Sequence, residues 1–423
     1  MQKHDAAYKA YVQILKEELV PAMGCTEPIA VAYCAAKAKE ALGAIPDKID
    51  IKVSGNILKN VKSVVVPNTD GLIGVEASAA AGIIGGKPDK ELEVISEVTP
   101  EQKIQIKEYL SKATFSVAPT YGEELLEILI KVEKDGHTAT AHIIRGHANI
   151  VRVEKDGNVL FQKDENEAAS HGADRSLLNI KDIIEFATIA EIDDIREPLQ
   201  RQIEYNSAIS NAGLTQNWGA CIGKTMNDTQ GDLLRTKAKA AAAAGADARM
   251  SGCELPVIIV SGSGNQGITA SMPVITYAKA LGKTEEELYR ALCVSDLIAL
   301  HEKTGIGKMS AFCGAMCAGS GAGAGIAYLQ GADLQTISNA IISGLGIVSG
   351  MVCDGAKPSC AAKVAAAVDS GILGYELCLN GKRLKGGEGI LSDDVEKTIQ
   401  NVGRMGKEGM AETDYVIQAI MTE

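Results

Sequence analysis

Several cysteines of this sequence stand where a thiol could act as a nucleophile, a base or a metal ligand. Cys25 lies in the segment Gly24-Cys25-Thr26-Glu27-Pro28, directly before a predicted helix start. A thiol at a helix N-terminus has a lowered pKa and reacts more readily. Cys353 and Cys360 flank a polar loop that contains a glycine and a proline. These residues predict a turn, so both sulfurs could face one centre.

Other cysteines are more easily explained as packing residues. Cys313 and Cys317 are one helical turn apart and share a helix face. A free cysteine is most often a small buried hydrophobe, and we favour this interpretation for Cys34, Cys221, Cys253, Cys293 and Cys378. For Cys25, Cys353 and Cys360, spacing leaves burial and a cluster or metal site equally open. Thiolates hold iron–sulfur clusters, whereas a hydrolytic zinc more often includes histidine or carboxylate.

A glycine-rich loop at Ser261–Gly267 is a further feature with binding chemistry. It follows the apolar run Val257–Val260 and has the form GxGxxG. A dinucleotide fold needs a strand about 20 residues on, but residues 283–303 predict a helix instead. Backbone N–H groups at a helix start favour a small anion, so a carboxylate would suit this loop, and a tight turn is the alternative. Residues 220–225 (ACIGKT) lack the glycine spacing of a P-loop.

Composition and charge narrow the classes of function. The chain has 423 residues, with 54 acidic and 42 basic side chains and a net charge of −12, whereas a nucleic-acid binder needs a basic patch. Its ten cysteines are too few for a disulfide scaffold, and the N-terminus lacks the apolar stretch of a signal peptide.

Two uncharged runs, 309–332 and 334–353, would be long enough to span a bilayer. Their Gly, Ser, Gln and Asn content favours buried helices, so we expect a cytoplasmic protein with no nucleic-acid or membrane partner.

The elements that must position these residues change in type along the chain. Residues 5–19 and a segment from Thr26 to Gly43 predict helices. Strands are expected at 49–55, 63–67, 92–98 and 113–119, with helices at 71–85 and 100–111 between them. Asp135-Gly136 and Asp156-Gly157 predict hairpin turns. From about residue 191 the chain is Ala/Gly-rich and mainly helical.

This order predicts an α+β fold in three parts. Residues 1–45 form N-terminal helices that bear Cys25 and pack on the helical domain, 46–192 form an α+β domain with mixed helices and strands, and 193–423 form a large, mainly helical domain. A site shared by Cys25 and the cysteines far along the chain would lie in the cleft between the two domains.

Four segments together resemble the iron–sulfur L-cysteine desulfidases, the cysteine-degrading branch of the iron–sulfur L-serine dehydratase superfamily. They are PAMGCTEP at 21–28, SGSGNQGI at 261–268, HEKTGIGKMSAFCGAMCAGSGAGAGIAYLQG at 301–331 and SGLGIVSGMVCDGAKPSC at 343–360. The resemblance covers nearly the whole chain in order. It implies a 4Fe-4S cluster held by Cys313, Cys353 and Cys360, with Cys25 at the fourth iron. Cys317 has no assigned role. The serine dehydratases carry a cysteine in the C-terminal tail and this chain does not, which favours the desulfidase branch.

The resemblance implies β-elimination of L-cysteine to pyruvate, ammonia and hydrogen sulfide. The open iron would serve as a Lewis acid and Cys25 as the catalytic base for the Cα proton. L-cysteine is the expected partner, and a homodimer is one assembly that the chain could form. The candidate substrate-binding residues are Ser54, Asn56, Asn68, Thr69, Ser263, Asn265, Gln266, His301 and Lys303. For each of them a cap, turn or surface role is the alternative.

Two other functions stay open on the sequence. An L-serine dehydratase with the same cluster would eliminate water from L-serine. A non-enzymatic iron–sulfur or zinc sensor would bind metal without elimination, although the acidic charge and the lack of a DNA-binding module count against it. An exposed fourth iron is oxygen-labile, so aerobic preparations could lose the cluster.

Overall fold

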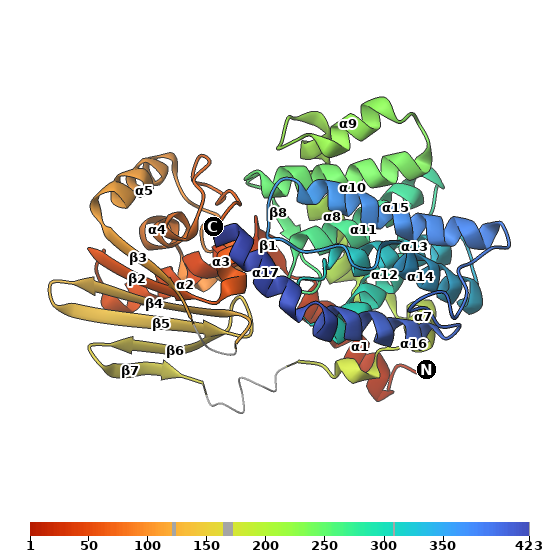
Figure 1. The fold of residues 1–423 in the computed structure, drawn as a ribbon, viewed down its shortest axis with the longest axis horizontal. Coiled ribbons are helices and arrows are strands. Elements are labelled where there is room, and N and C mark those ends of the chain that lie inside the picture. The colour runs from red at the N-terminus through yellow and green to blue at the C-terminus, as the bar shows by residue number, and fades with distance from the viewer. Residues whose placement is uncertain (121–123, 164–171, 308, 423) are drawn as a thin grey trace.

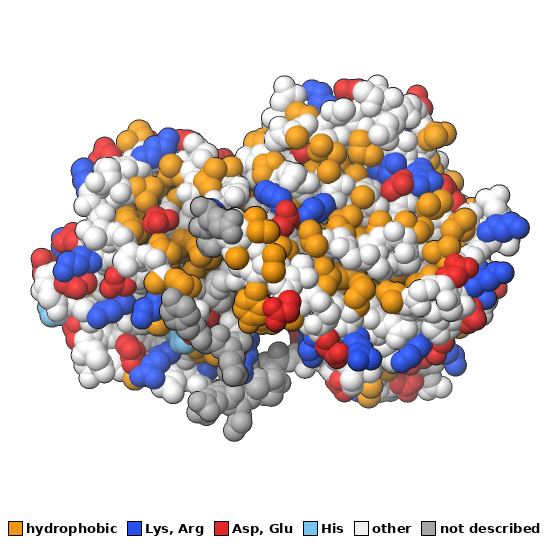
Figure 2. Space-filling model, viewed as in Figure 1, with side chains coloured by type: hydrophobic (Ala, Val, Ile, Leu, Met, Phe, Trp, Pro, Cys, Tyr) orange, Lys and Arg blue, Asp and Glu red, His pale blue; other side chains and the backbone are white. Residues whose placement is uncertain are grey.

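The computed structural model describes residues 1–120, 124–163, 172–307 and 309–422, which form a sheet lobe and a helical lobe (Figure 1). The sheet lobe comprises the chain from α2 to β7. The helical lobe comprises α1 and the described chain from residue 172 onward. On the face drawn in Figure 2, acidic and basic side chains are interspersed over both lobes. The observed helices, mixed sheet and large helical region confirm the predicted α+β class.

Within the described residues, six strands form one mixed sheet in the order β3-β2-β4-β5-β6-β7. The pair β2–β3 is parallel and the other neighbours are antiparallel. Both Asp-Gly turns occur as predicted, with positive φ at each of the four residues. The strands are β2 (Lys48–Val53), β3 (Thr114–Pro119), β4 (Glu127–Lys134), β5 (His137–Ile144), β6 (Ile150–Lys155) and β7 (Asn158–Gln162).

Helix α2 (Thr26–Leu42) shares its hydrophobic core with the sheet and with α4 (Val75–Gly85). The 3-10 helix η1 (Pro88–Glu93), α3 (Gly55–Val61) and α5 (Pro100–Lys112) complete this lobe. Helix α1 (Ala6–Glu18) packs in the core of the helical lobe. The expectation that both N-terminal helices pack on the helical domain is therefore wrong for α2. Its Ala-rich surface is buried on nearly every side, and much of it faces β4 and β5.

The helical lobe is a dense bundle whose core already includes Leu178, so its boundary lies before the predicted position at 192. The two uncharged runs form the buried helices expected of them, and no helix of the described residues is long and apolar enough to cross a membrane. The helices are α7 (Ile180–Ile189), α8 (Ile192–Thr215), α9 (Ile222–Thr229), α10 (Leu234–Met250), α11 (Gly264–Ala280), α12 (Glu285–Ile306), α13 (Ala315–Leu329), α14 (Leu334–Val348), α15 (Cys360–Leu379) and α16 (Val395–Arg404). The 3-10 helix η2 (Arg175–Leu177) precedes α7, and the π-helix η3 (Met405–Gly409) follows α16.

The C-terminal helix α17 (Ala411–Thr422) crosses from the helical lobe to α3 of the sheet lobe (Figure 1). Lys59 Nζ lies 2.5 Å from Asp414 Oδ1, and both side chains are largely buried. This ion pair ties the two lobes together at the end of the chain.

Two of the expected strands are absent from the described residues. Val65 makes only an isolated bridge to Ile73, and residues 92–98 form the end of η1 followed by turns. Most apolar side chains of these segments are buried nonetheless, and Val65 and Leu92 are half-buried. A short apolar run predicts burial, but it does not by itself predict a strand.

Candidate active site

A cavity of about 120 Å³ between the lobes is lined by all four cysteines that the resemblance selects. The sheet lobe contributes the start of α2, the helix α3 and His147 before β6. The helical lobe contributes the end of α10, the start of α11, and the segments around residues 309–315 and 353–364. The four cysteines therefore meet between the two domains, where the sequence analysis expects the site.

A short strand pair that the sequence did not predict brings Cys25 to this cavity. β1 (Pro21–Met23) pairs antiparallel with β8 (Pro256–Ile258), directly before the glycine-rich loop. Gly24 then turns the chain with φ +63°, and a Cβ there would lie 2.2 Å from Pro67 Cγ. Cys25 follows as the N-cap residue of α2, and Thr26 Oγ1 lies 3.0 Å from the carbonyl oxygen of Gly262.

Backbone pairing also determines the positions of the Cys313 and Cys353 thiols. Phe312 and Val352 form an antiparallel bridge. Cys313 N donates to Met351 O (2.9 Å), and Cys353 N donates to Ala311 O (2.6 Å). Side chains alternate between faces along such a pair, so the thiols of Cys313 and Cys353 project on the same side as diagonal neighbours.

The third thiol and Cys25 meet at the start of α15. Cys360 is the first residue of this helix. Cys25 packs in a small cluster with Val64 and Met250, and Cys360 packs against that cluster. Two distant parts of the chain thus place their sulfurs on one cavity.

The thiols of Cys25, Cys313 and Cys360 stand in an environment that opposes their charge. Burial, followed by the nearby charge of Cys353, raises the pKa of Cys313 to about 12. Burial also raises the pKa of Cys360. Burial, followed by the charge of Glu27, raises the pKa of Cys25 well above its usual value. This is the reverse of the lowered pKa expected from the helix start, because desolvation and a neighbouring carboxylate outweigh the helix terminus.

The chemistry of the donor set is that of iron–sulfur ligands, because thiolates hold such clusters. Each iron of a cluster takes its own thiolate, so cluster ligands are spread more widely than the ligands of one ion. Cys313, Cys353 and Cys360 are free thiols that line a shared cavity and interact through their charges. These three residues would hold the cluster.

Glu27 is a buried carboxylate of the site that the sequence analysis did not select. Its Oε2 accepts hydrogen bonds from Cys25 Sγ (2.9 Å) and Thr26 Oγ1 (3.0 Å), and its Oε1 accepts one from Asn60 Nδ2 (2.9 Å). His147 Nε2 lies 3.8 Å from Oε1, which is an ion-pair distance and too long for a hydrogen bond. Burial opposes ionisation, but the nearby His147 and the hydrogen bond from Cys25 lower the pKa of Glu27. The sequence feature that could have selected Glu27 as a site residue is its position two residues after Cys25.

Several buried polar atoms of the cavity lining have no hydrogen-bond partner among the described residues. Such atoms are rare in folded proteins and call for a ligand or water. They are Asn56 Oδ1, Asn60 Oδ1, His147 Nε2, Arg249 Nε and Nη2, and Gln266 Oε1. Lys59, Lys303 and Lys363 add cationic side chains to the same lining. The cavity therefore offers unpaired amide oxygens as acceptors, and unpaired guanidinium N–H groups of Arg249 as donors, beside the thiols.

The structure brings together only part of the predicted substrate-binding set. Asn56, Ser263, Asn265, Gln266 and Lys303 line the cavity. The other four candidates lie outside that lining and have structural partners. Ser54 Oγ donates to Leu125 O (3.0 Å), Asn68 Nδ2 to Ile95 O (2.8 Å) and Thr69 Oγ1 to Val66 O (2.6 Å), while His301 Nε2 lies 2.7 Å from Glu396 Oε2.

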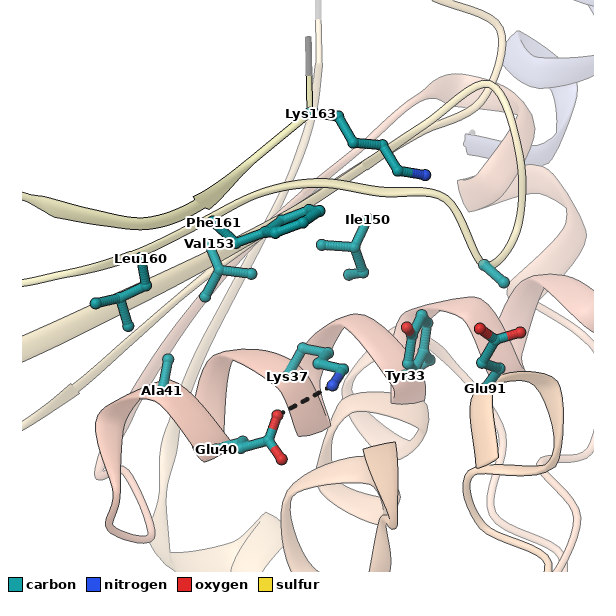
Figure 3. Close-up of a pocket in the computed structure, with 11 residues that line it drawn as sticks. Tyr33, Lys37, Glu40, Ala41, Glu91, Ile150, Val153, Leu160, Phe161 and Lys163 are labelled. Carbon is teal, nitrogen blue, oxygen red and sulfur yellow. Dashed lines mark hydrogen bonds and ion pairs between the residues drawn. The ribbon is translucent and has the colours of Figure 1, made fainter. Parts of the chain in front are cut away.

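A larger pocket of about 510 Å³ lies elsewhere, between α2 and the β6–β7 hairpin (Figure 3). Ile150, Val153 and Phe161 line its sheet side, and its charged pair Lys37–Glu40 is joined at 3.1 Å. It contains no cysteine among its lining residues. We therefore assign the candidate site to the smaller cavity, where the thiols and the unpaired polar atoms are found.

The fold and the cavity define a two-lobed α+β protein with a thiol-lined site between its lobes. Residues 89–419 match the model of the serine dehydratase alpha chain family. The chain is 56% identical over 422 residues to a UPF0597 protein of Desulfitobacterium hafniense, covering 100% of this chain and 98% of that protein. It is 47% identical over 414 residues to a UPF0597 protein of Lachnoclostridium phytofermentans, covering 98% and 99%. The chain belongs to the serine dehydratase alpha chain family, a family of enzymes whose iron–sulfur members use a 4Fe-4S cluster.

Proposed function

We propose that this chain is an L-cysteine desulfidase that converts L-cysteine to pyruvate, ammonia and hydrogen sulfide with a 4Fe-4S cluster. One observation carries the proposal: Cys25, Cys313, Cys353 and Cys360 line one cavity together with unpaired polar atoms. Family membership supports dehydratase-type chemistry in general, in which a group leaves Cβ of an amino acid.

Cys313, Cys353 and Cys360 would hold the cluster, and Cys25 is placed to handle the proton. When bound, a cluster with one iron free of these three thiols supplies a Lewis acid that makes sulfur a better leaving group. Cys25 is a thiol that donates to Glu27, so it must first lose its proton to water, which the nearby positive charge of Arg249 favours. The resulting thiolate would take the proton from Cα, the Cα–Cβ double bond would form, and the Cβ–S bond would break to release sulfide. The aminoacrylate product then takes up water and yields pyruvate and ammonia. Glu27 accepts the Cys25 hydrogen bond and so orients this sulfur.

The position of the C-terminal helix supports cysteine over serine as the substrate. As the resemblance implies, the serine dehydratases carry a cysteine in the C-terminal tail that can approach the fourth iron. Here α17 presents Asp414 to Lys59 at the cavity lining, and the chain has no cysteine after Cys378. Cys25 would then be the thiol beside the iron that the three ligands leave open.

An anaerobic assay with L-cysteine and L-serine tests the proposal. We expect sulfide and pyruvate in equal amounts from L-cysteine, at a higher kcat/KM than pyruvate from L-serine. Cys25→Ala should abolish turnover. Cys34→Ala is the matched control, because Cys34 lies on α2, outside the cavity lining, and its thiol faces the sheet carbonyls of Ile128 and Ala141.

The other outcomes assign other functions. Pyruvate from L-serine without sulfide from L-cysteine would place the chain among the serine dehydratases. A bound cluster with no elimination from either amino acid would indicate a sensor and contradict the proposal.

A further inference from the structure

Arg249 is the most buried charged group of the cavity, and no carboxylate of the described residues forms an ion pair with it. It is 2% exposed at the end of α10. The charges of Cys25, Glu27 and Cys360 act on it, and the Cys25 thiol lies beside it. Its Nε and Nη2 atoms nevertheless have no hydrogen-bond partner within bonding distance among the described residues. A buried guanidinium in this condition is strongly unfavourable unless an anion from outside the chain completes it.

The surroundings hold this guanidinium in a fixed place. Its Nη1 donates to Asn265 Oδ1 (3.1 Å). A Cβ on Gly264 would lie 2.3 Å from Arg249 Nε, so only glycine allows the side chain to lie against the start of α11. One edge of the guanidinium is thus used for positioning, while Nε and Nη2 remain for a ligand.

The nearby carboxylate of Glu27 already accepts hydrogen bonds from other donors. Glu27 accepts its hydrogen bonds from Cys25, Thr26 and Asn60. The positive charge of Arg249 lies close enough to Cys25 and Cys360 to interact with both. A ligand bound to Arg249 would therefore sit beside the proposed base and the proposed cluster.

We propose that Arg249 binds the α-carboxylate of the amino-acid substrate through Nε and Nη2, with Asn265 holding the guanidinium in position. Arginine binds carboxylates in a planar, bidentate geometry. The start of α11 adds a helix N-terminus that favours the same negative charge. This assignment rests on the proposed function, because it names the group that orients Cα toward Cys25.

Calorimetric titrations of the anaerobic holoprotein test the assignment. The probes are 3-mercaptopropionate, which has a thiol and a carboxylate, and cysteamine, which has a thiol and an amine but no carboxylate. Arg249→Lys should weaken 3-mercaptopropionate binding by about 30-fold or more, as expected for loss of a buried charge-assisted contact, and leave cysteamine binding unchanged. With L-cysteine the same variant should raise KM far more than it lowers kcat, because the carboxylate is bound in both the ground and the transition state.

Asn265→Asp provides a second variant that does not depend on truncating Arg249. It places a carboxylate against the guanidinium at the existing 3.1 Å contact, so an internal anion competes with the ligand. An acidic residue in the first turn of α11 also favours folding. We expect the same selective loss of 3-mercaptopropionate binding. Arg235→Lys is the matched control on α10, because Arg235 is already paired with Asp369 and Glu376.

The outcomes separate this assignment from the proposed function. Selective loss of carboxylate binding in both variants supports it, even if the wild-type protein releases no sulfide from L-cysteine. Equal weakening of both probes, loss of iron from both variants, or unchanged binding of 3-mercaptopropionate would overturn it.

Discussion

Replacing Asp414 by alanine should release the C-terminal helix from the sheet lobe. Lys59 and Asp414 are joined at 2.5 Å, and their side chains are 2% and 14% exposed. Lys59 Nζ also donates to the carbonyl of Cys353 (3.4 Å), so this contact links α17 to a proposed cluster ligand. The variant leaves the Lys59 ammonium buried without its counter-ion.

Removing one partner of a buried ion pair costs about 3–5 kcal/mol. At about 1.4 kcal/mol per factor of ten, a loss of 3 kcal/mol raises the released fraction of the helix about 150-fold. Replacing both partners by apolar residues, as in Lys59→Met with Asp414→Leu, should cost much less, because no charge stays buried.

Hydrogen exchange followed by mass spectrometry measures this release in residues 411–422. We expect exchange in α17 to accelerate about 100-fold in Asp414→Ala, and by a much smaller factor in the double variant. Glu412→Ala is the matched control on the same helix, since Glu412 is exposed. Unchanged exchange in Asp414→Ala, or equal acceleration in the double variant, would refute this account of the ion pair.

The remaining predictions concern the cluster ligands, the buried carboxyl group of Asp296 and the turn at Gly24. Cys353→Ala should lose the brown absorbance and all turnover, whereas Cys25→Ala should keep the absorbance and lose turnover; retained iron and activity in Cys353→Ala would contradict the ligand assignment. Burial raises the pKa of Asp296 to about 7, so above about pH 4 the native state keeps a proton that the unfolded chain has lost. Stability should fall by up to about 4 kcal/mol between pH 4 and 7, and urea titrations of Asp296→Asn should show a flatter pH dependence. Gly24→Ala should cost about 2–4 kcal/mol in the same titrations, through its positive φ and its contact with Pro67; an unaffected midpoint would show that the turn adapts.

The sequence predicts most of the elements because their signals are local. The Asp-Gly turns predict both hairpins, and the glycine after residue 42 predicts the end of α2, which the structure confirms with φ +81° at Gly43. Val64, Val66, Val94 and Ile95 are buried, but the strands predicted for their segments are wrong. Whether such a run pairs as a strand depends on neighbours far along the chain.

The cysteines of the candidate site could be selected from the sequence, but their surroundings could not. The pair β1–β8 joins three residues on each side across more than 200 positions, and short pairs of this kind have no local signature. Glu27 and Arg249 become notable only through burial and unmatched hydrogen bonds. The pKa of Cys25 was predicted in the wrong direction for the same reason, because burial and the Glu27 charge are tertiary effects.

The central claim is that the thiol-lined cavity holds a 4Fe-4S cluster. Iron and acid-labile sulfide in anaerobically purified protein test it most directly. The account predicts about four iron and four sulfide per chain, lost together in Cys313→Ala. Protein that contains neither iron nor labile sulfide after anaerobic purification and reconstitution would contradict it.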